Sequence, residues 1–509
     1  MKKMTSVPTV RDMGQQQAYT EGEMPKESRQ RKPSPGKKAN KEMAVVTYIF
    51  IAIFMLLAVY MMVFVIRDSD QVLNNPANKR SEIWAKHVVR GSILSSDGQA
   101  LARTEVGKKG KETRVYPYGS LFAHVVGRTS QGATGLESSE NYELLNSNLN
   151  PFNRIINEFN GEKSPGNNVV TTLNLRLSQV ASEALGSRRG SVVVMEPKTG
   201  KIVTMVSKPS YDPNGLTDER WKEISASSGD DSPLLNRATQ GLYPPGSTFK
   251  MYTALAYIRQ NMDYEEFRHK CKGSIGTGDG GKIRCYGGEV HGKVDLTTAF
   301  AESCNTAFCK IGEKLNVAGW RNLCESLYFN KAIPIDKLSK NVSKFQLTSE
   351  TSKGDVMQAS IGQGDVLVTP LQNVLLAAAV ANGGKLMKPY VVDKIVDFDG
   401  KVLSETSPKS LGRPVAKQEA KTMQTLMRAT VQRGTATSLY YGTPYKAAGK
   451  TGSAEYKAGS SDSHAWFVGY VTYKGKKLAI SVLVEGGGTG GAVAVPIAKR
   501  VFDAWADGL

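Results

Sequence analysis

The sequence is organised around residues 244–250, which read Pro-Pro-Gly-Ser-Thr-Phe-Lys. The Pro-Pro-Gly breaker is followed by residues 251–260, which contain no Gly or Pro and are rich in helix formers. Because positions i and i+3 lie on one face of a helix, Lys250 can reach the hydroxyl of Ser247. The spacing therefore predicts a nucleophile and its base at the start of a helix.

Two further short motifs follow along the chain, Ser303-Cys-Asn305 and Lys450-Thr-Gly452. Each motif is weak alone, because residues 34–37 repeat the first spacing and residues 198–200 repeat the third. The order S-x-x-K, S-x-N, K-T-G is much more specific, and it is the signature of serine β-lactamases and penicillin-binding proteins. The three motifs together therefore predict three walls of one cleft.

The patterning between and around these motifs predicts one α+β domain. Runs of β-branched residues around turns predict a hairpin near residue 190 and a second hairpin near the C-terminus. Helical patterns lie between the hairpins, and strands at both ends imply a sheet that is closed by its own termini. The predicted segments are strands at 191–195, 201–206, 446–455 (an edge strand lining a cleft), 465–473 and 477–484, and helices at 294–315, 370–381, 416–432 and 496–506.

The N-terminal part of the chain predicts a membrane anchor. Residues 1–43 are polar and predict a disordered tail, and residues 44–66 carry no charge. At about 1.5 Å per residue this helix spans ~35 Å, enough to cross a bilayer. A cleaved signal peptide is disfavoured by the length of the tail. Seven basic residues stand in the twenty before the span and four in the twenty after it, so we expect the tail in the cytoplasm.

Composition narrows the partners and cofactors. The chain has 509 residues and a formal net charge of +19, which favours an anionic neighbourhood such as lipid or wall polymer. We find no nucleic-acid-binding motif and expect no nucleic-acid partner. The five cysteines form no C-x-x-C pair, so we expect no zinc or redox site, and an odd number leaves at least one thiol outside an intrachain pair. Cys271 and Cys285 lie in one loop, and spacing alone leaves their pairing open.

With these contexts, the sequence resembles the class B penicillin-binding proteins, which are monofunctional peptidoglycan transpeptidases, and in particular their small penicillin-binding protein A group. The resemblance implies an antiparallel sheet with helices on both sides plus an all-helical subdomain, preceded by one transmembrane helix and a small, mainly β spacer domain. We place the spacer at residues 67–186 and the transpeptidase domain at 187–509. The resemblance rests on the three motifs and on Arg90-Gly-Ser-Ile93, Arg237-Ala238, Gln358-Ala-Ser-Ile-Gly-Gln-Gly364, Thr369-Pro-Leu-Gln372, Gly434-Thr-Ala436 and Ala465-Trp-Phe-Val-Gly469.

The resemblance also implies a role for each motif residue. Ser247 is the expected nucleophile and Lys250 its base, while an alternative gives the base role to Lys450 and Ser303 together. Ser303 is expected to relay the proton to the leaving amine, and Asn305 is expected to orient Lys250 and the peptide amide. Lys450, Thr451 and Ser453 are expected to hold the substrate carboxylate, and Gly452 allows close approach. We expect no metal and no cofactor in this chemistry.

The expected substrates are peptidoglycan stem peptides as donor and acceptor, with β-lactams acylating the same serine. Membrane lipid around the single helix and a membrane glycosyltransferase of the division or elongation machinery are the other expected partners. The expected location is the bacterial cell membrane with the catalytic domain outside. A D,D-carboxypeptidase or a β-lactam sensor remains the alternative, whereas a β-lactamase is disfavoured by the anchor and by the absence of an E-x-x-L-N pattern between residues 305 and 450.

Overall fold

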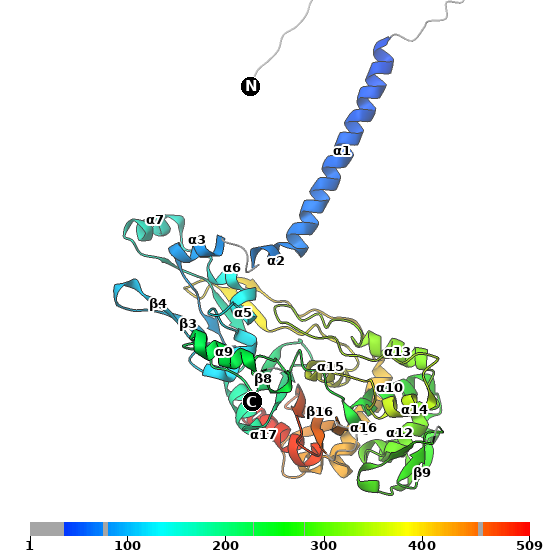
Figure 1. Cartoon of the computed structure of the whole chain (residues 1–509). Helices are drawn as coiled ribbons and strands as arrows, with labels where there is room; N and C mark the ends of the chain where they lie inside the picture. Colours follow the sequence, from blue (N-terminus) through cyan, green and yellow to red (C-terminus); the bar gives the residue numbers. More distant parts are fainter. Residues whose placement is uncertain (1–34, 75–79, 228, 279, 457–461) are drawn as a thin grey trace, which may run out of the picture. The chain divides into compact units, whose positions relative to one another are not determined.

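The computed structural model describes residues 35–509 except 75–79, 228, 279 and 457–461, and it divides into two units, residues 1–69 and 70–509. The described part of the first unit is the helix α1 (Pro35–Arg67) (Figure 1). Its residues 40–67 are long and apolar enough to cross a membrane. The predicted disordered tail lies mostly outside the described residues, but residues 35–43 are helical, so the helix starts before the predicted span.

The unit formed by residues 70–509 contains a five-stranded antiparallel sheet in the order β15-β16-β17-β7-β8. The strands β7 (Gly190–Met195) and β8 (Ile202–Lys208) come from the start of the predicted catalytic domain. The strands β15 (Lys446–Glu455), β16 (Ser463–Tyr473) and β17 (Lys476–Val484) come from its end. The predicted sheet closed by its own termini is therefore confirmed, and the K-T-G motif lies on an edge strand.

Helices cover both faces of this sheet because side chains alternate along each strand. The helices α8 (Leu175–Leu185) and α17 (Val495–Asp507) cover one face, against Val192 and Val482. The other face, with Val193 and Leu483, packs on the main core, which includes the helix α15 (Pro370–Ala381). All twelve residues of α15 are buried, and Thr369 caps its first turn as predicted. The expected sandwich of helix, sheet and helix is confirmed (Figure 1).

A helical region lies beside this sheet, but it is less uniform than predicted. It contains α10 (Lys250–Gln260), α12 (Asn305–Gly312), α13 (Val317–Ser326), α14 (Lys353–Ser360) and α16 (Lys417–Arg433). The prediction of one helix over 294–315 is wrong, because α11 (Leu296–Ala301) ends before Ser303, which has a φ of 61°. Residues 268–295 also form four short strands, β9 (Arg268–Cys271), β10 (Ser274–Gly276), β11 (Lys282–Arg284) and β12 (Gly292–Asp295).

A second, six-stranded sheet has the order β14-β13-β6-β2-β3-β4. Its strands β2 (Ile93–Leu94), β3 (Ala100–Val106), β4 (Glu112–Val115) and β6 (Asn168–Thr171) belong to the predicted spacer. Its strands β13 (Val392–Val396) and β14 (Val402–Glu405) come from far along the chain, and β13 pairs with β6. The addition of these two strands to the sheet of the spacer was not predicted. The domain boundary at 186/187 stays a prediction.

A buried ion-pair cluster anchors the Arg-Gly-Ser-Ile motif of the spacer. Glu137 is fully buried, and its two carboxylate oxygens each accept from a guanidinium Nε at 2.7 Å, one from Arg90 and one from Arg114. Burial alone raises the pKa of Glu137, but the charges of the two arginines outweigh it and hold the pKa below its ordinary value. Gly91 is required beside this cluster, because a Cβ there would lie 1.8 Å from the carbonyl oxygen of Asn167.

Candidate active site

Ser247 lies in a 3₁₀ turn, residues Gly246–Phe249, that leads directly into α10. The N–H of Gly246 donates to the carbonyl of Gly362 at 2.9 Å, and Gly246 has a φ of 51°. A Cβ on Gly362 would lie 2.1 Å from the Gly246 oxygen, so this close backbone approach requires glycine there. The turn therefore holds Ser247 at a fixed place at the start of α10, as the spacing predicted.

The edge strand β15 lies directly against this turn. A Cβ on Gly246 would lie 2.7 Å from the Ser453 carbonyl oxygen, and a Cβ on Gly452 would lie 3.1 Å from the carbonyl oxygen of Pro245. The indole Nε1 of Trp466, on the next strand, donates to the carbonyl of Pro244 at 3.1 Å. The K-T-G strand and the serine turn are thus in backbone contact, which brings Ser247 and Ser453 side by side.

Lys250 connects the first two motifs. Its side chain is fully buried, and its Nζ donates to the carbonyl of Ser303 at 2.6 Å, to the Ser303 hydroxyl at 3.2 Å and to Asn305 Oδ1 at 2.7 Å. The Ser303 carbonyl is free to accept this bond because the helix is interrupted there. Within the described part of the chain, no hydrogen bond joins Lys250 Nζ to Ser247 Oγ.

Lys450 is the second fully buried lysine, and it lies on β15 opposite Val468. Its Nζ donates to the carbonyl of Thr451 at 3.1 Å and lies 5.8 Å from the ring centroid of Phe300. The hydroxyl of the neighbouring Thr451 is hydrogen-bonded to the hydroxyl of Thr435. Lys450 therefore lies behind the wall that Thr451 presents to solvent.

The two lysines lie in an environment that disfavours positive charge. Burial lowers the pKa of Lys250 to about 8. Burial lowers the pKa of Lys450 well below its ordinary value, and the positive charge of Lys250 lowers it further. Burial and the mutual repulsion of the two ammonium groups therefore both favour the neutral amine at this pair of lysines.

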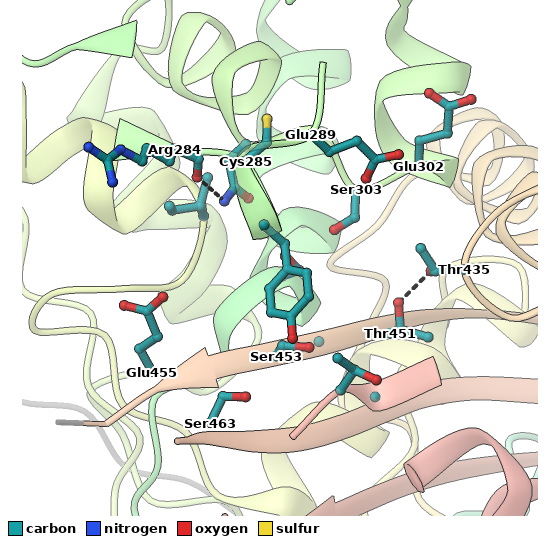
Figure 2. A pocket seen from close by; sticks show the side chains of 18 of the residues that line it. Arg284, Cys285, Glu289, Glu302, Ser303, Thr435, Thr451, Ser453, Glu455 and Ser463 are labelled. Carbon is teal, nitrogen blue, oxygen red and sulfur yellow. Dashed lines mark hydrogen bonds between the residues drawn. The ribbon is translucent and has the colours of Figure 1, made fainter. Parts of the chain in front are cut away.

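The motif residues meet at one cavity of about 930 Å³ (Figure 2). Its wall includes six of the eight predicted site residues, namely Ser247, Ser303, Asn305, Thr451, Gly452 and Ser453. Lys250 and Lys450 do not line it and lie beneath these residues. Figure 2 shows Thr451 and Ser453 along β15, with Ser303 on the opposite side. The expected three walls of one cleft are present.

Sequence reasoning gave no role to several residues that line this cavity. Thr435 belongs to the quoted Gly-Thr-Ala motif, and here it supports Thr451. Gln363 also lines the cavity, and with its amide oriented to satisfy both groups it bonds the N–H and C=O of Glu455 at 3.2 Å each. Residues 282–289 form a further wall. The quoted motifs around Thr435 and Gln363 were the signals in the sequence, whereas residues 282–289 are brought to the cavity by tertiary packing.

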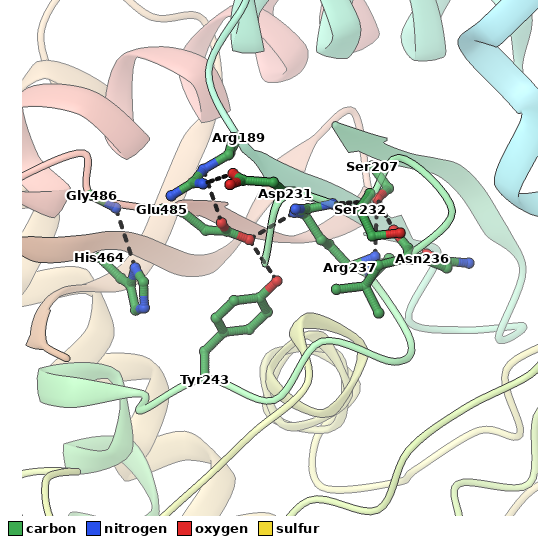
Figure 3. A network of polar contacts seen from close by, with 12 residues as sticks. Arg189, Ser207, Asp231, Ser232, Asn236, Arg237, Tyr243, His464, Glu485 and Gly486 are labelled. Atoms are coloured by element: carbon green, nitrogen blue, oxygen red, sulfur yellow. Dashed lines mark hydrogen bonds and ion pairs between the residues drawn. The ribbon is translucent and has the colours of Figure 1, made fainter. Parts of the chain in front are cut away.

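A polar network fixes the segment that leads to the serine turn (Figure 3). Glu485 Oε1 accepts from Arg237 Nε and from the hydroxyl of Tyr243, both at 2.7 Å. Its Oε2 lies 3.3 Å from Arg189 Nε. The side chain of Arg237 is fully buried and that of Glu485 is 3% exposed. The carboxylate therefore ties residues 237–243 to the end of β17.

We expect Glu485→Ala to lower the free energy of unfolding by about 3–5 kcal/mol, because it removes one partner of a buried ion pair. Chemical denaturation of the purified full chain measures this loss. Glu405→Ala is the control, because Glu405 is an exposed residue on β14 and its loss should change stability by less than about 0.5 kcal/mol. Equal stability of the two variants would contradict a structural role for this network.

Comparison with known proteins identifies the family. The sequence model of the penicillin-binding protein transpeptidase domain matches residues 190–503. The chain belongs to the penicillin-binding protein family. A second model, described as the penicillin-binding protein A dimerisation domain, matches residues 90–169. The resemblance inferred from the motifs is therefore confirmed.

Relatives cover most of the chain. The peptidoglycan D,D-transpeptidase PbpA of Mycolicibacterium smegmatis is 34% identical over 474 residues, which cover 86% of this chain and 93% of the relative. The peptidoglycan D,D-transpeptidase MrdA of Escherichia coli is 26% identical and covers 78% of this chain. The structure of penicillin-binding protein A from M. tuberculosis as a penicillin G acyl-enzyme complex is 32% identical, with a TM-score of 0.74 over 82% of this chain and 99% of that chain.

Proposed function

We propose that this penicillin-binding protein cross-links peptidoglycan as a serine D,D-transpeptidase, with Ser247 as the nucleophile. The observation that carries the proposal is that Ser247, Ser303, Asn305 and Ser453 line one cavity above the buried Lys250. The relatives named D,D-transpeptidase and the acyl-enzyme structures of penicillin-binding protein A support the same reaction class.

Acylation begins when Ser247 Oγ attacks the carbonyl carbon of the penultimate D-Ala of a donor stem peptide. Lys250 accepts the hydroxyl proton, and the backbone N–H groups of Ser247 and Ser453 stabilise the oxyanion, each by roughly 3 kcal/mol. The tetrahedral intermediate collapses, the peptide bond breaks, and Ser303 passes the proton from Lys250 to the departing D-Ala amine. The contact between the Ser303 hydroxyl and Lys250 Nζ at 3.2 Å supports this relay.

Residues of the strand β15 bind the terminal carboxylate of the donor peptide. The hydroxyls of Thr451 and Ser453 face the cavity, and Lys450 supplies charge from behind them. An anionic carboxylate raises the pKa of Lys450 and thereby favours its protonated form. The new positive charge repels the proton on Lys250, which favours the neutral amine that a base requires. Substrate binding thereby activates the base.

The second half of the reaction transfers the acyl group to an amine of a second stem peptide. The attacking amine loses its proton to Lys250 through Ser303, the ester to Ser247 breaks, and the serine regains its proton. The cavity of about 930 Å³ is large enough for peptide groups on both sides of Ser247. Transfer to an amine rather than to water distinguishes a transpeptidase from a D,D-carboxypeptidase.

The reaction partition tests the function directly. The full chain in detergent is incubated with a donor peptide ending in D-Ala-D-Ala, with and without glycine as an amine acceptor. We expect the transfer product to form in proportion to glycine and to exceed the hydrolysis product, as measured by mass spectrometry. A hydrolysis product that forms at the same rate with and without glycine, and without transfer, would favour a carboxypeptidase. Rapid turnover of penicillin would favour a β-lactamase.

The lowered pKa of Lys250 predicts a pH profile. The base is active when neutral, so below pH 8 each unit decrease in pH should lower its active fraction about tenfold. We expect the second-order rate of acylation by penicillin to rise by roughly two orders of magnitude between pH 6 and pH 9 and then to level off. Circular dichroism at each pH controls for unfolding. A rate that stays flat over this range would exclude Lys250 as the titrating base.

The membrane arrangement is also a proposal. Helix α1 anchors the chain once, and the excess of basic residues before it places residues 1–43 in the cytoplasm and the catalytic domain outside. Protease added outside intact spheroplasts should then remove the catalytic domain and leave the tail intact.

A transpeptidase needs glycan strands, so we propose a membrane glycosyltransferase as partner. Failure of such an enzyme to co-purify with the full chain would oppose this proposal.

A further inference from the structure

Three cysteines and one histidine meet beside the active site, at the base of the strands β9–β12. Cys271 ends β9, Cys285 follows β11, His291 precedes β12, and Cys304 precedes α12. The Sγ of Cys285 lies 3.7 Å from that of Cys271 and 3.9 Å from that of Cys304, and Cys271 Sγ lies 3.5 Å from His291 Nδ1. All four ligand atoms lie within 4.8 Å of one another.

We propose that Cys271, Cys285, His291 and Cys304 bind one zinc ion, which holds the Ser303-Cys-Asn305 motif in place. With Zn–S bonds of about 2.3 Å and a Zn–N bond of about 2.0 Å, a tetrahedral site has S···S edges of about 3.8 Å and S···N edges of about 3.6 Å. The three close contacts match these edges. Three thiolates and an imidazole form a donor set that favours zinc over magnesium or calcium.

The surroundings of the cluster are those of a closed structural site. The three cysteines are buried, and the N–H of Gly273 donates to Cys271 Sγ at 3.3 Å, which stabilises a thiolate. The Nε2 of His291 lies 3.6 Å from the carboxylate of Glu289, on the side of the ring away from Cys271. That distance is too long for a hydrogen bond, so the choice of Nδ1 as the metal ligand rests on its 3.5 Å contact with Cys271 Sγ.

A disulfide explains this geometry less completely. Cys285 lies almost equally close to Cys271 and to Cys304, so a bond to either would leave the other thiol and the imidazole outside the bond, within 4.8 Å of it. A disulfide also requires sulfurs about 2.05 Å apart, which means that one side chain must move by more than 1 Å. One zinc ion accounts for all four groups at once. This proposal opposes the expectation of no zinc site, which rested on the lack of a C-x-x-C pair, because the ligands come from four separated positions between residues 271 and 304.

The position of the cluster connects it to catalysis. Cys304 stands between the two site residues of the second motif, and Asn305 Nδ2 donates to the carbonyl of Arg284 at 2.8 Å. Cys285 and His291 themselves line the active-site cavity (Figure 2 labels Cys285). A metal here would fix Ser303 and Asn305 relative to Lys250, and it would also fix the cavity wall at residues 282–291. This effect on acylation rests on the proposed function, whereas metal binding does not.

The test measures zinc by inductively coupled plasma mass spectrometry in the full chain, purified in detergent under reducing conditions. We expect about one zinc per chain in the wild type and close to none in Cys285→Ser. Cys324→Ala is the matched control, because it removes a fully buried thiol outside the cluster, on α13, and should retain the zinc. Ser247→Ala should also retain it, which separates metal binding from the proposed activity.

Cobalt substitution in the wild type supplies a readout that does not depend on a variant's folding. We expect the intense visible bands and the thiolate charge-transfer band of tetrahedral cobalt, both lost on addition of zinc. Chelation of the metal should slow acylation by penicillin about tenfold or more, with recovery on adding zinc, because small displacements of positioned groups cost this much. Zinc no higher than in Cys285→Ser would overturn the proposal. So would a Cys271–Cys285 disulfide, revealed by an intact-mass shift on reduction of protein prepared without reductant.

Discussion

Ser247→Ala is expected to abolish covalent labelling of the chain by fluorescent penicillin. We propose that this hydroxyl forms the acyl-enzyme, and the turn at Gly246 holds it at the start of α10. The stoichiometry should fall from one label per chain to none, and the rate of peptide transfer should fall by at least about 10⁴-fold. In-gel fluorescence and mass spectrometry of the acylated peptide measure these losses.

Ser481→Ala is the matched control for this result. Ser481 is a fully buried serine on β17, and its hydroxyl has no hydrogen-bond partner among the described residues, so its loss should leave stability and labelling almost unchanged. Labelling that survives in Ser247→Ala would show that another residue is the nucleophile. An acylated peptide that contains Ser303 would place the nucleophile on the second motif.

Lys250→Met is expected to slow acylation by about 10³-fold without preventing binding of the donor peptide. Methionine keeps the length of the side chain but removes the amine that accepts the proton, and general-base catalysis is worth about 10² to 10⁴-fold. The rate that remains should lose its dependence on pH near 8. Stopped-flow acylation by penicillin between pH 6 and pH 9 measures both effects.

Lys477→Met controls for the loss of a partly buried lysine, since among the described residues its Nζ donates to the carbonyl of Ala381, at the end of α15. It should acylate at the wild-type rate. A Lys250→Met enzyme that keeps the pH profile of the wild type would transfer the base role to Lys450 and Ser303, the alternative left open by the motif spacing.

Lys450→Met should instead weaken recognition of the terminal carboxylate. Its buried amine lies behind Thr451, where a charge acts on the ligand held by the hydroxyls of β15. A double-mutant cycle with a donor peptide whose carboxylate is amidated isolates this interaction. Amidation of the peptide should cause a large loss of affinity for the wild type and only a small loss for Lys450→Met. Equal losses for both proteins would show that Lys450 does not take part in carboxylate binding.

The local sequence was sufficient to predict an element of structure wherever the residues that determine it lie close together in the chain. The breaker before Ser247 and the helix after it follow from Pro, Gly and helix-forming residues, and the capped helix that begins after Thr369 follows from its Thr-Pro start. The apolar runs at 465–473 and 477–484 around a Gly-containing turn predicted the hairpin β16–β17, which the structure contains. The order of three motifs was enough to predict that Ser247, Asn305 and Ser453 share one cavity.

Prediction failed where contacts distant in sequence override local pattern. Residues 294–315 are rich in helix formers, yet the helix is interrupted at Ser303, whose carbonyl accepts a hydrogen bond from Lys250. The hairpin β13–β14 joins the sheet of the spacer although more than 200 residues separate β13 from β6. No local signal encodes either contact, because each stabilises the fold only after the partner is in place.

The sequence by itself determined the family, the reaction class and the apolar helix, and it proposed Ser247 as the nucleophile, since these depend on residue type and short-range spacing. Only the tertiary structure decided the environment of each group. It buried Lys250 and Lys450 behind the cavity wall and lowered both pKa values. It also gathered Cys271, Cys285, His291 and Cys304 into one cluster. Burial and proximity depend on how the whole chain packs, and for this reason they cannot be read from any single stretch.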